Sequence, residues 1–454
     1  MILNHHGNYT LTDGSEIAVI GGGPSGSFFT YFLLEFARRY GTKVKVDVIE
    51  AKDFTCAGPK GCNNCGGIVS ESLVQLLSTE GIVLPSKVIR RGIESYTLHL
   101  EQGSTMITAP FKEQKIAAMF RGKGPKGSVD TGLESFDNYL LELCRDKGAH
   151  IIYDKVTELT RNEKGILLKT QNGFEKEYSL IAGAVGLNQK TLKFIEPLFP
   201  DFKPPVTTKT FITEIYLEEE TIDKYFGNSM HVFLLNLPNI KFGAIIPKGH
   251  YVTLVLLGKD INKDIVDGFL NSDSVRDCFP EGFNLKEFMH CQCYPTINIK
   301  GALPVFSDKF VLVGDCSSSK LYKNGIGAAY ITGKAAARTA IFEGISSADF
   351  RKYYLPVCKG LNRDNTIGKF IFLATTIIQK SSFIKRGMLG MVINEQKKAG
   401  SKRSMSAVLW DTFTGSAPYT DILRRFMNPL LIITLIWQII KSNFKAIVRG
   451  KSKR

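Results

Sequence analysis

IAVIGGGPSG, at residues 17–26, is the stretch that decides the fold of this chain. A short apolar run that ends in G-x-G-x-x-G predicts the first strand, the tight turn and the helix start of a dinucleotide-binding βαβ unit. Gly21 makes the turn, Gly23 lets the backbone approach a pyrophosphate, and Gly26 lets the helix pack closely on the strand. The helix start adds free N–H groups and a positive dipole end. The residues expected to face the pyrophosphate are Gly21, Gly23, Pro24, Ser25 and Gly26.

The residues after this motif strengthen the prediction. An amphipathic helix is expected from about Ser27 to Tyr40, and VKVDVIE at residues 44–50 predicts a second strand that ends in Glu50. A carboxylate at this position can accept hydrogen bonds from both hydroxyl groups of an adenosine ribose. G-x-G-x-x-G alone is a weak signal, but a preceding strand, a following helix and a terminal acid make it strong.

A second motif near the other end of the chain indicates which dinucleotide binds. KFVLVGD at residues 309–315 is an apolar strand that ends in Gly-Asp, and KNGIGAA at residues 323–329 opens a helix that runs to about Phe342. These segments resemble the second FAD motif of the flavoprotein superfamily that holds p-hydroxybenzoate hydroxylase and the geranylgeranyl reductases. The resemblance implies that the aspartate binds the ribityl chain and that the glycine turn lies under the flavin pyrimidine. The implied FAD-binding residues are Gly314, Asp315, Gly325, Ile326 and Gly327.

Two further segments resemble the geranylgeranyl reductases in particular. Cys65, Gly66 and Gly67 resemble the Cys-Gly-Gly segment that this family places near the flavin, which implies a catalytic role for them. WDTFTG at residues 410–415 and YTDILRR at residues 419–425 resemble the helical C-terminal tail of the same family.

The arginine that contacts the flavin in this family is displaced in this sequence. FDNYL at residues 136–140 matches the family's Phe-Asp-x-x-Leu, but Leu133 stands where the arginine is expected. Arg121 is the best substitute and is therefore added to the expected cofactor-binding residues.

Two departures bear on the reaction. GAVG at residues 183–186 carries Val185 where the aromatic hydroxylases have an aspartate. In those enzymes the aspartate helps to hold FAD and the transiently bound nicotinamide cofactor. FGAIIPK at residues 242–248 carries Ala244 and Ile246 where the reductases have tryptophan and phenylalanine, which should reshape the apolar tunnel. No second G-x-G-x-x-G follows a strand, so a resident NAD(P)H domain is not expected.

Three cysteines near the expected flavin edge leave alternatives open. Cys56, Cys62 and Cys65 follow a C-x5-C-x2-C spacing that matches no standard four-cysteine metal run, and no metal site is predicted. Cys65 is interpreted as a redox or proton-donating thiol, and Cys56 as a small residue that packs a tight loop. An iron–sulfur or zinc site is the alternative, with a fourth ligand from Cys291, Cys293 or Cys316.

Charge and length set the remaining frame. The chain has 454 residues, which is too long for one core. Its formal charge is +15. The positive charge gathers at residues 379–403 and 441–454. We see no nucleic-acid recognition motif, so nucleic acid is not an expected partner, whereas an anionic membrane surface or an acidic ferredoxin or flavodoxin donor fits this charge. Nine scattered cysteines and no signal peptide favour a cytoplasmic protein.

The C-terminal apolar run, residues 429–440, is too short to span a bilayer. Its basic flanks and Trp437 favour a helix that lies in the interface, on the inner face of the cell membrane. A terminal helix buried against the body of the protein is the alternative.

Together these features predict an α/β protein. The fold implied by the resemblance is a Rossmann-like FAD domain of the p-hydroxybenzoate hydroxylase type, with an inserted antiparallel β-sheet substrate domain and a helical C-terminal tail. The expected parts are a discontinuous FAD domain at 1–78, 118–190 and 300–345, a β-rich domain at 79–117 and 191–299, helices at 346–426, and an interface segment at 427–454. The implied activity is reduction of carbon–carbon double bonds in a prenyl or other lipophilic chain. A flavin monooxygenase that acts on a lipophilic or quinone-like substrate is the alternative, and the substrate, electron donor and oligomeric state stay open.

Overall fold

The computed structural model describes residues 9–62, 65–110, 113–128, 132–199, 201–397 and 403–451, the last seven of these by their backbone alone. The chain divides into two compact units. The first combines Met1–Asn63, Arg121–Thr207 and Thr296–Asn365, and the second combines Asn64–Phe120, Thr208–Pro295 and Thr366–Arg454.

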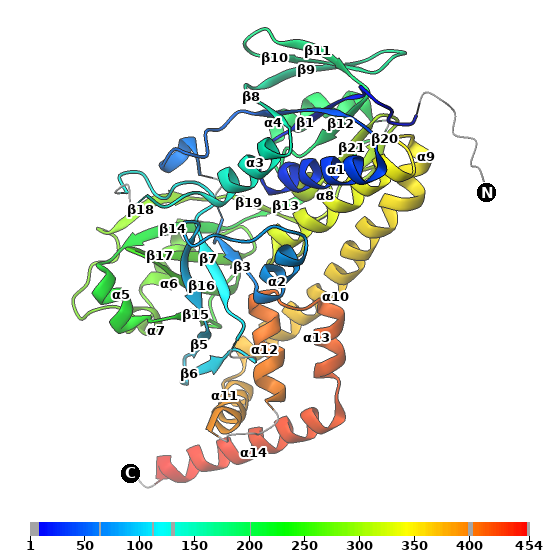
Figure 1. Cartoon of the computed structure of the whole chain (residues 1–454). Helices are drawn as coiled ribbons and strands as arrows, with labels where there is room; N and C mark the ends of the chain where they lie inside the picture. Colours follow the sequence, from blue (N-terminus) through cyan, green and yellow to red (C-terminus); the bar gives the residue numbers. More distant parts are fainter. Residues whose placement is uncertain are drawn as a thin grey trace. The chain divides into compact units, whose positions relative to one another are not determined.

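A six-stranded sheet forms the centre of the first unit, with the strand order β20-β21-β12-β1-β2-β8 (Figure 1). All neighbours pair in parallel except β20 and β21. The carboxyl ends of β1, β12 and β21 therefore meet at one edge of the sheet, where open α/β sheets bind ligands. The strands are β1 Glu16–Ile20, β2 Lys45–Glu50, β8 His150–Tyr153, β12 Leu180–Gly183, β20 Phe306–Ser307 and β21 Phe310–Leu312.

Two long helices that follow β1 and β21 lie side by side in this unit (Figure 1). They are α1, Pro24–Tyr40, and α8, Gly325–Phe342. Gly333 allows the close approach, because a Cβ there would lie 2.9 Å from the backbone nitrogen of Phe29. Tyr330 packs edge-on against Phe28, with ring centroids 5.7 Å apart. The two glycine motifs thus start helices that are packed together.

Smaller elements complete the first unit. An antiparallel meander of β9, β10 and β11 lies between β8 and β12 in the chain, as expected for residues 156–186. The elements are η1 Gly58–Lys60, α3 Phe136–Asp146, β9 Val156–Arg161, β10 Ile166–Thr170, β11 Glu175–Tyr178, α4 Gln189–Ile195, η2 Glu196–Leu198, β19 Thr296–Lys300, η3 Gly314–Cys316, α9 Ser347–Asp349 and the π-helical turn η4 Phe350–Tyr354. β13, Val206–Lys209, pairs with β19.

A seven-stranded sheet dominates the second unit, with the order β18-β14-β17-β16-β15-β5-β6. Within residues 205–258, β14 to β17 pair antiparallel with one another, as expected, whereas β13 pairs with β19 in a separate sheet. β15 also pairs in parallel with β5. A separate small sheet has the order β3-β7-β4. The strands are β3 Ile68–Val69, β4 Ile89–Ile93, β5 Ser95–Leu100, β6 Gly103–Thr108, β7 Ile116–Met119, β14 Phe211–Tyr216, β15 Ser229–Phe233, β16 Ile240–Lys248, β17 Tyr251–Gly258 and β18 Met289–Cys293.

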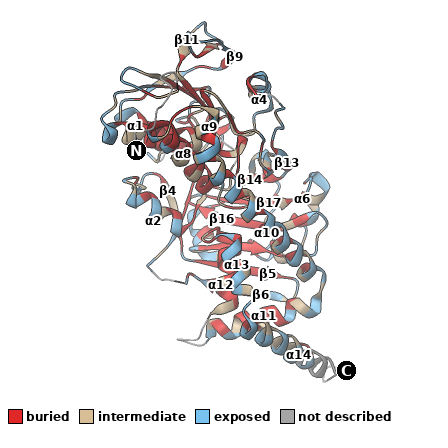
Figure 2. Cartoon of the chain, turned by 90° about the vertical axis from the view of Figure 1, so that its right-hand side faces the viewer, coloured by how far each residue is buried: buried red, intermediate tan, exposed pale blue. Residues whose placement is uncertain are grey.

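An apolar core covers one face of this sheet. It combines strand residues such as Phe233 and Leu254 with Val266, Phe269 and Phe279 from the segment around α6 and α7. Buried residues accordingly concentrate along the strands in Figure 2. The short helices of this unit are α2 Glu71–Thr79, α5 Glu219–Tyr225, α6 Lys263–Leu270 and α7 Asp273–Arg276.

The C-terminal part is helical, as expected. It comprises α10 Leu355–Lys380, α11 Ser382–Lys397, α12 Ser404–Thr414, α13 Tyr419–Phe426 and α14 Pro429–Lys451. Trp410 of α12 is fully buried, stacks on Tyr96 and donates its indole N–H to Glu71 at 2.8 Å. The helical tail is therefore anchored to the β-rich part of the second unit by a buried aromatic side chain.

The first crossing between the units comes after residue 63, earlier than the residue 78 expected from the sequence. β3 pairs with β7 through Ile68 and Val69, so this segment belongs with the second unit. Hydrogen bonding to a strand that is distant in sequence decides this boundary, and no local pattern marks it.

By length and composition, no single described helix is sufficient to cross a membrane, and two bent helix pairs pass the same test only when taken together. The pairs are Ser347–Lys380 with Ser382–Lys397, bent by 105°, and Tyr419–Phe426 with Pro429–Phe444, bent by 65°.

Candidate functional site

The turn after β1 has a geometry that only glycine satisfies. Gly21 has φ +103°, and a Cβ on it would lie 2.5 Å from the carbonyl oxygen of Ala184. A Cβ on Gly26 would lie 1.8 Å from the carbonyl oxygen of Gly21. The turn and the helix–strand contact that the sequence predicted are therefore both present.

The start of α1 is built to receive an anion. Gly23 is the N-cap residue, with extended backbone and no side-chain cap, and Pro24 is the first helical residue. The N–H groups of the first helical turn have no intrahelical acceptors and stabilise negative charge. Ser25, also predicted at this site, lies in the same turn.

Glu50 ends β2 and reaches back to the glycine turn. Its Oε2 accepts the backbone N–H of Gly22 at 2.6 Å, and its Oε1 accepts that of Lys52 at 2.7 Å. Burial raises the pKa of Glu50, and the two hydrogen bonds oppose that rise. Each carboxylate oxygen keeps a lone pair that can accept a ribose hydroxyl.

Arg121 lies at the same turn, while its predicted contact with the flavin stays a prediction. Its guanidinium donates to Asp137 from Nε at 3.0 Å and from Nη2 at 2.7 Å. Asp137 is fully buried in the first turn of α3. Arg121 Nη2 lies 3.2 Å from the position that a Cβ on Gly23 would take. The ion pair therefore fixes a cation beside the expected pyrophosphate position.

The second motif is in direct contact with the first. Gly314 has φ +74°, and a Cβ on it would lie 1.9 Å from Oγ of Ser25. Its N–H donates to Oγ1 of Thr332 in α8 at 2.9 Å. Two segments that are almost 290 residues apart in the sequence thus meet through one glycine.

Asn298 is a residue of this site that sequence reasoning missed. Its Nδ2 donates to the backbone carbonyl of Asp315 at 2.7 Å, while its Oδ1 is buried and has no hydrogen-bond partner among the described residues. Buried amide oxygens are normally paired, so a polar ligand group beside Asp315 would complete this one. Nothing in the strand TINIK around Asn298 signals this role.

The start of α8 also excludes side chains. Asn324 caps the helix in the left-handed region, with φ +52°, and its Oδ1 accepts the N–H of Gly327 at 2.9 Å. A Cβ on Gly327 would lie 2.3 Å from that oxygen. Gly325 and Ile326 are the first two helical residues and present the remaining N–H groups of the turn. Because both helix starts, Glu50 and the open Asn298 amide belong to one unit, these residues fit an extended polar cofactor such as FAD.

The predicted catalytic segment belongs to the second unit. Gly67 has φ +66°, and a Cβ there would lie 1.9 Å from the carbonyl oxygen of Met119, so glycine is required. Its N–H donates to Sγ of Cys65 at 3.4 Å. Gly66 lies against Val255, whose Cγ2 would be 3.2 Å from an added Cβ. The role of these residues at the flavin stays a prediction.

A buried lysine beside this segment was also missed by sequence reasoning. Lys248 is 1% exposed, and its Nζ lies 2.8 Å from the position of a Cβ on Gly67 and 4.6 Å from the ring centroid of Phe120. Glu214 is buried in the same sheet, and burial raises its pKa while the charge of Lys248 opposes the rise. This pair cannot be recognised in the sequence, because Lys248 and Glu214 lie on separate strands.

The remaining cysteines of the N-terminal loop have local partners. The Cys56 thiol donates to Oδ2 of Asp53 at 3.3 Å, and the carbonyl of Cys62 accepts Nζ of Lys52 at 2.6 Å. Cys65 lies in the other unit, and a metal site shared by all three thiols stays an alternative rather than a prediction.

The chain is similar to several known proteins. No protein-family model matches the chain. An uncharacterized protein of Methanosarcina barkeri is 25% identical over 368 residues, which cover 79% of this chain and 84% of that protein. A geranylgeranyl bacteriochlorophyll reductase-like protein from Thermoplasma acidophilum superposes with a TM-score of 0.63 at 14% identity, covering 92% of this chain and 99% of that one.

Two further structures are similar to this chain. A flavoprotein/dehydrogenase from Cytophaga hutchinsonii gives a TM-score of 0.58 at 15% identity, over 97% of this chain and all of that one. PqsL, a probable FAD-dependent monooxygenase from Pseudomonas aeruginosa, gives 0.53 at 11% identity, over 80% and 97%. The chain has the fold of these flavoproteins. The p-hydroxybenzoate hydroxylase-like fold predicted from the sequence is thereby confirmed. Sequence identities this low do not show which substrate the chain binds or which reaction it catalyses.

Proposed function

We propose that this chain is an FAD-dependent oxidoreductase that reduces carbon–carbon double bonds in a prenyl or other long lipophilic chain. The contact of Gly314 with Ser25, which joins the ribityl motif to the pyrophosphate motif, supports FAD as the cofactor. The resemblance of Cys65, Gly66 and Gly67 to the Cys-Gly-Gly segment of the geranylgeranyl reductases supports the reaction. A nicotinamide-only domain would need the first motif alone.

The residues have distinct proposed tasks. The start of α1 and Arg121 would hold the pyrophosphate, Glu50 the adenosine ribose, Asp315 the ribityl chain, and the start of α8 the pyrimidine end of the flavin. When bound and reduced, FAD supplies a hydride to one carbon of the double bond.

The other carbon needs a proton, which we assign to the Cys65 thiol. The N–H of Gly67 donates to the Cys65 sulfur and would stabilise the thiolate left after the proton is given. Water then returns a proton to the thiolate, so one hydride and one proton are added per double bond. The buried charge of Lys248 beside Gly67 would hold this segment in place.

A monooxygenase reaction on a lipophilic substrate is the second candidate, and the similarity in fold to PqsL favours it. Val185 argues against it, since valine cannot supply the carboxylate that the hydroxylases use at this position.

The two candidates differ in how the reduced enzyme behaves. We expect photoreduced holoenzyme to react slowly with O2 and to reoxidise rapidly when geranylgeranyl diphosphate is added without O2. Rapid O2 consumption together with no anaerobic reoxidation by the prenyl substrate would replace the reductase by the monooxygenase.

We further propose that α14 docks on an anionic membrane from which the lipophilic substrate enters. One face of α14 packs on α11, where Gly387 and Gly390 allow contact with Ile439 and Ser442. The opposite face is apolar and exposed, at 53–72% for its residues within 430–444. These residues are Leu430, Ile433, Ile436, Trp437, Ile440 and Phe444.

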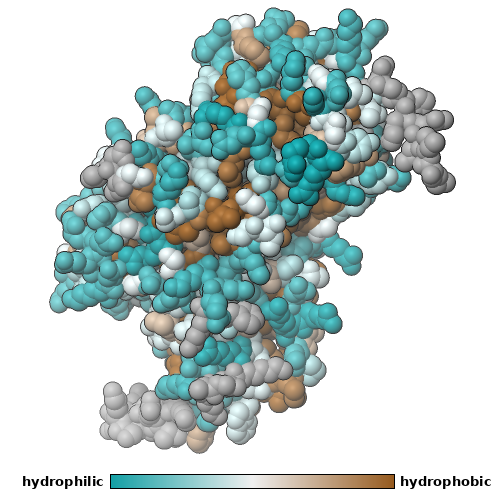
Figure 3. Space-filling model, in the orientation of Figure 1, coloured by the Kyte–Doolittle hydropathy of each residue, from teal (hydrophilic) through white to brown (hydrophobic). Residues whose placement is uncertain are grey.

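The positive charge of the residues around this face favours an anionic bilayer as its partner. No Asp or Glu follows Asp421, while Arg424 is exposed before the apolar stripe and Lys441 is exposed between Ile440 and Phe444. Figure 3 shows apolar side chains at the end of the second unit where α14 begins. The side chains of the basic residues after 444 lie outside the described residues. An interfacial helix with these features binds the inner leaflet, each nearby cation contributing about 1 kcal/mol.

Flotation with liposomes tests the membrane proposal. Trp437→Glu and Ile440→Glu alter exposed side chains, so the fold should persist while flotation with anionic vesicles falls by about tenfold or more. Val83→Glu, at an exposed apolar position outside α14, is the control and should float like the wild type. Equal flotation of all variants would refute the proposal.

An acidic ferredoxin or flavodoxin is the proposed electron donor. Exposed cations follow one face of α10, among them Lys359, Arg363, Lys369 and Lys380. One expected member of the basic surface is excluded, because Lys385 is 3% exposed and pairs with Glu101. Lys398 and Lys402 lie outside the described residues. Stopped-flow reduction by ferredoxin should be faster than by NADPH and should slow at high salt; the reverse order would contradict the donor assignment.

A further inference from the structure

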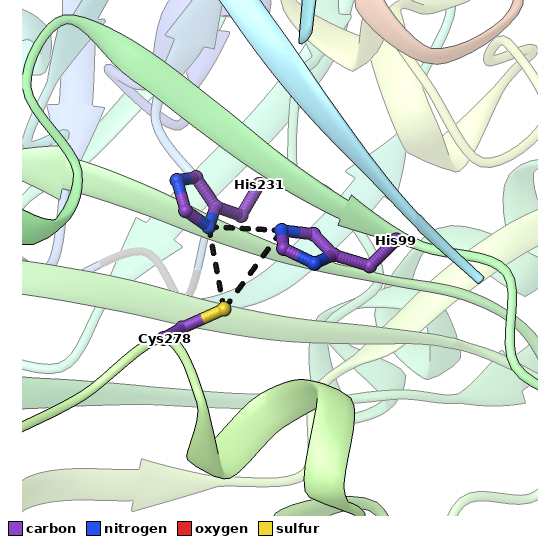
Figure 4. A group of neighbouring side chains, drawn as sticks. All are labelled: His99, His231 and Cys278. Atoms are coloured by element: carbon purple, nitrogen blue, oxygen red, sulfur yellow. Dashed lines mark hydrogen bonds between the residues drawn. The ribbon is translucent and has the colours of Figure 1, made fainter. Parts of the chain in front are cut away.

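Three potential metal-binding side chains converge in the second unit, outside the residues assigned to flavin or substrate (Figure 4). His99 lies on β5, His231 on the neighbouring strand β15, and Cys278 directly after α7. The His99 Nε2 atom is 3.1 Å from His231 Nδ1. The Cys278 Sγ atom is 3.4 Å from His231 Nδ1 and 3.8 Å from His99 Nε2.

These distances define a triangle of the right size for a metal ion. The point equidistant from its three corners lies about 2.0 Å from each atom. Zinc binds histidine nitrogen at about 2.0–2.1 Å and cysteine sulfur at about 2.3 Å, so an ion close to this plane would reach all three donors without backbone movement.

The strand pairing holds the donors rigidly in place. β5 and β15 are parallel, with His231 opposite Thr97 and His99 opposite Phe233, so both imidazoles project from the same face of the sheet. The His99 ring stacks on Phe233, with centroids 4.5 Å apart, and Phe226 packs against His231 at 4.9 Å. Preorganised ligands lose little entropy when an ion binds.

The surroundings keep the imidazoles in the form that binds metal. His231 and Cys278 are buried and His99 is half-buried. Burial lowers the pKa of His99 and of His231, which favours the neutral imidazole that binds a metal ion. Burial raises the pKa of the Cys278 thiol to about 12, so an ion has to displace its proton.

We propose that His99, His231 and Cys278 bind a transition-metal ion of borderline softness, with Zn²⁺ as the natural probe. Two imidazoles and a thiolate are the donors that such ions prefer over Mg²⁺ or Ca²⁺. The ion would tie two strands of the large sheet to the segment after α7, and its fourth position would take water or another small ligand. This site is independent of the flavin chemistry proposed above.

Zinc analysis of the full-length holoenzyme tests the site. The protein is stripped with a chelator, loaded with Zn²⁺, dialysed, and titrated against a chromogenic zinc chelator. We expect about one zinc per wild-type chain and at least a tenfold weaker affinity in Cys278→Ser, with flavin content unchanged. Cys293→Ser makes the same chemical change in the same unit, outside the cluster, and should bind zinc like the wild type.

Substitution of zinc by cobalt tests the site in the wild-type protein, so the result does not depend on how a variant folds. Co²⁺ bound by two imidazoles and a thiolate should produce ligand-field absorption at wavelengths beyond the flavin bands. The proposal is overturned if the wild type binds no zinc and lacks these bands. It is also overturned if Cys278→Ser keeps the zinc while Cys65→Ala loses it, because the N-terminal cysteine loop would then hold the ion.

Discussion

Asp137→Asn probes how firmly the pyrophosphate end of the flavin site is built. Asp137 is fully buried and accepts hydrogen bonds from both Nε and Nη2 of Arg121, whose side chain is 19% exposed. Removing one partner of a fully buried ion pair costs about 3–5 kcal/mol. Because part of Arg121 reaches solvent and asparagine keeps one acceptor, we expect a loss of about 2–3 kcal/mol in the free energy of unfolding.

Glu142→Gln is the matched control on the same helix. Glu142 pairs with Arg145 through side chains that are 38% and 44% exposed. Exposed pairs contribute at most about 1 kcal/mol, so this variant should unfold almost like the wild type.

Urea unfolding of the apoprotein, followed by circular dichroism, compares the two variants, and titration with FAD adds a functional reading. Arg121 lies beside Gly23, so its displacement should weaken FAD binding by about tenfold, which corresponds to about 1.4 kcal/mol. If Asp137→Asn and Glu142→Gln unfold at the same urea concentration and bind FAD equally, the ion pair does not organise the site.

Other perturbations test separate parts of the account. Gly314→Ala should abolish FAD binding because the new Cβ overlaps Oγ of Ser25, and retained yellow colour would show that the motif contact is misplaced. Burial raises the pKa of Glu50 above its unfolded value, so the folded apoprotein binds the extra proton; its stability should fall as pH rises from about 4.5 through the folded pKa, and Glu50→Gln should flatten that slope in pH-dependent urea melts. Cys65→Ala should bind FAD normally and slow substrate-driven reoxidation by roughly tenfold or more, and an unchanged rate in stopped flow would return Cys65 to a packing role. Deleting residues 427–454 should abolish flotation with anionic vesicles yet leave FAD content intact, and loss of both would make α14 part of the folded core.

Local patterns were sufficient to predict the turns and helix starts of the two glycine motifs. The turn at Gly21, the acid at Glu50 and the helix start at Gly325 are each encoded within a few consecutive residues, because backbone conformation and close packing demand them there. Arg121 lies beside Gly23, at the pyrophosphate end, and its contact with the flavin stays a prediction.

Side chains that meet only through tertiary structure could not be predicted. Asn298 and Lys248 lie in ordinary strand sequences, and their burial beside Asp315 and Gly67 depends on which strands pair. The parallel pairing of β15 with β5, which brings His231 close to His99, likewise has no local signature. For the same reason, the sequence could not predict the solvent exposure of Lys385. Its position in a basic stretch suggests a surface cation, but its side chain is buried and pairs with Glu101.

The most direct test of the central claim is the cofactor itself. Full-length protein, loaded with FAD and freed of excess by gel filtration, should release one FAD per chain when it is denatured. Gly23→Val should retain almost none, because its side chain would occupy the space beside Arg121 into which the pyrophosphate must fit. A wild-type chain that retains no FAD, or a Gly23→Val variant that retains as much as the wild type, would contradict the account.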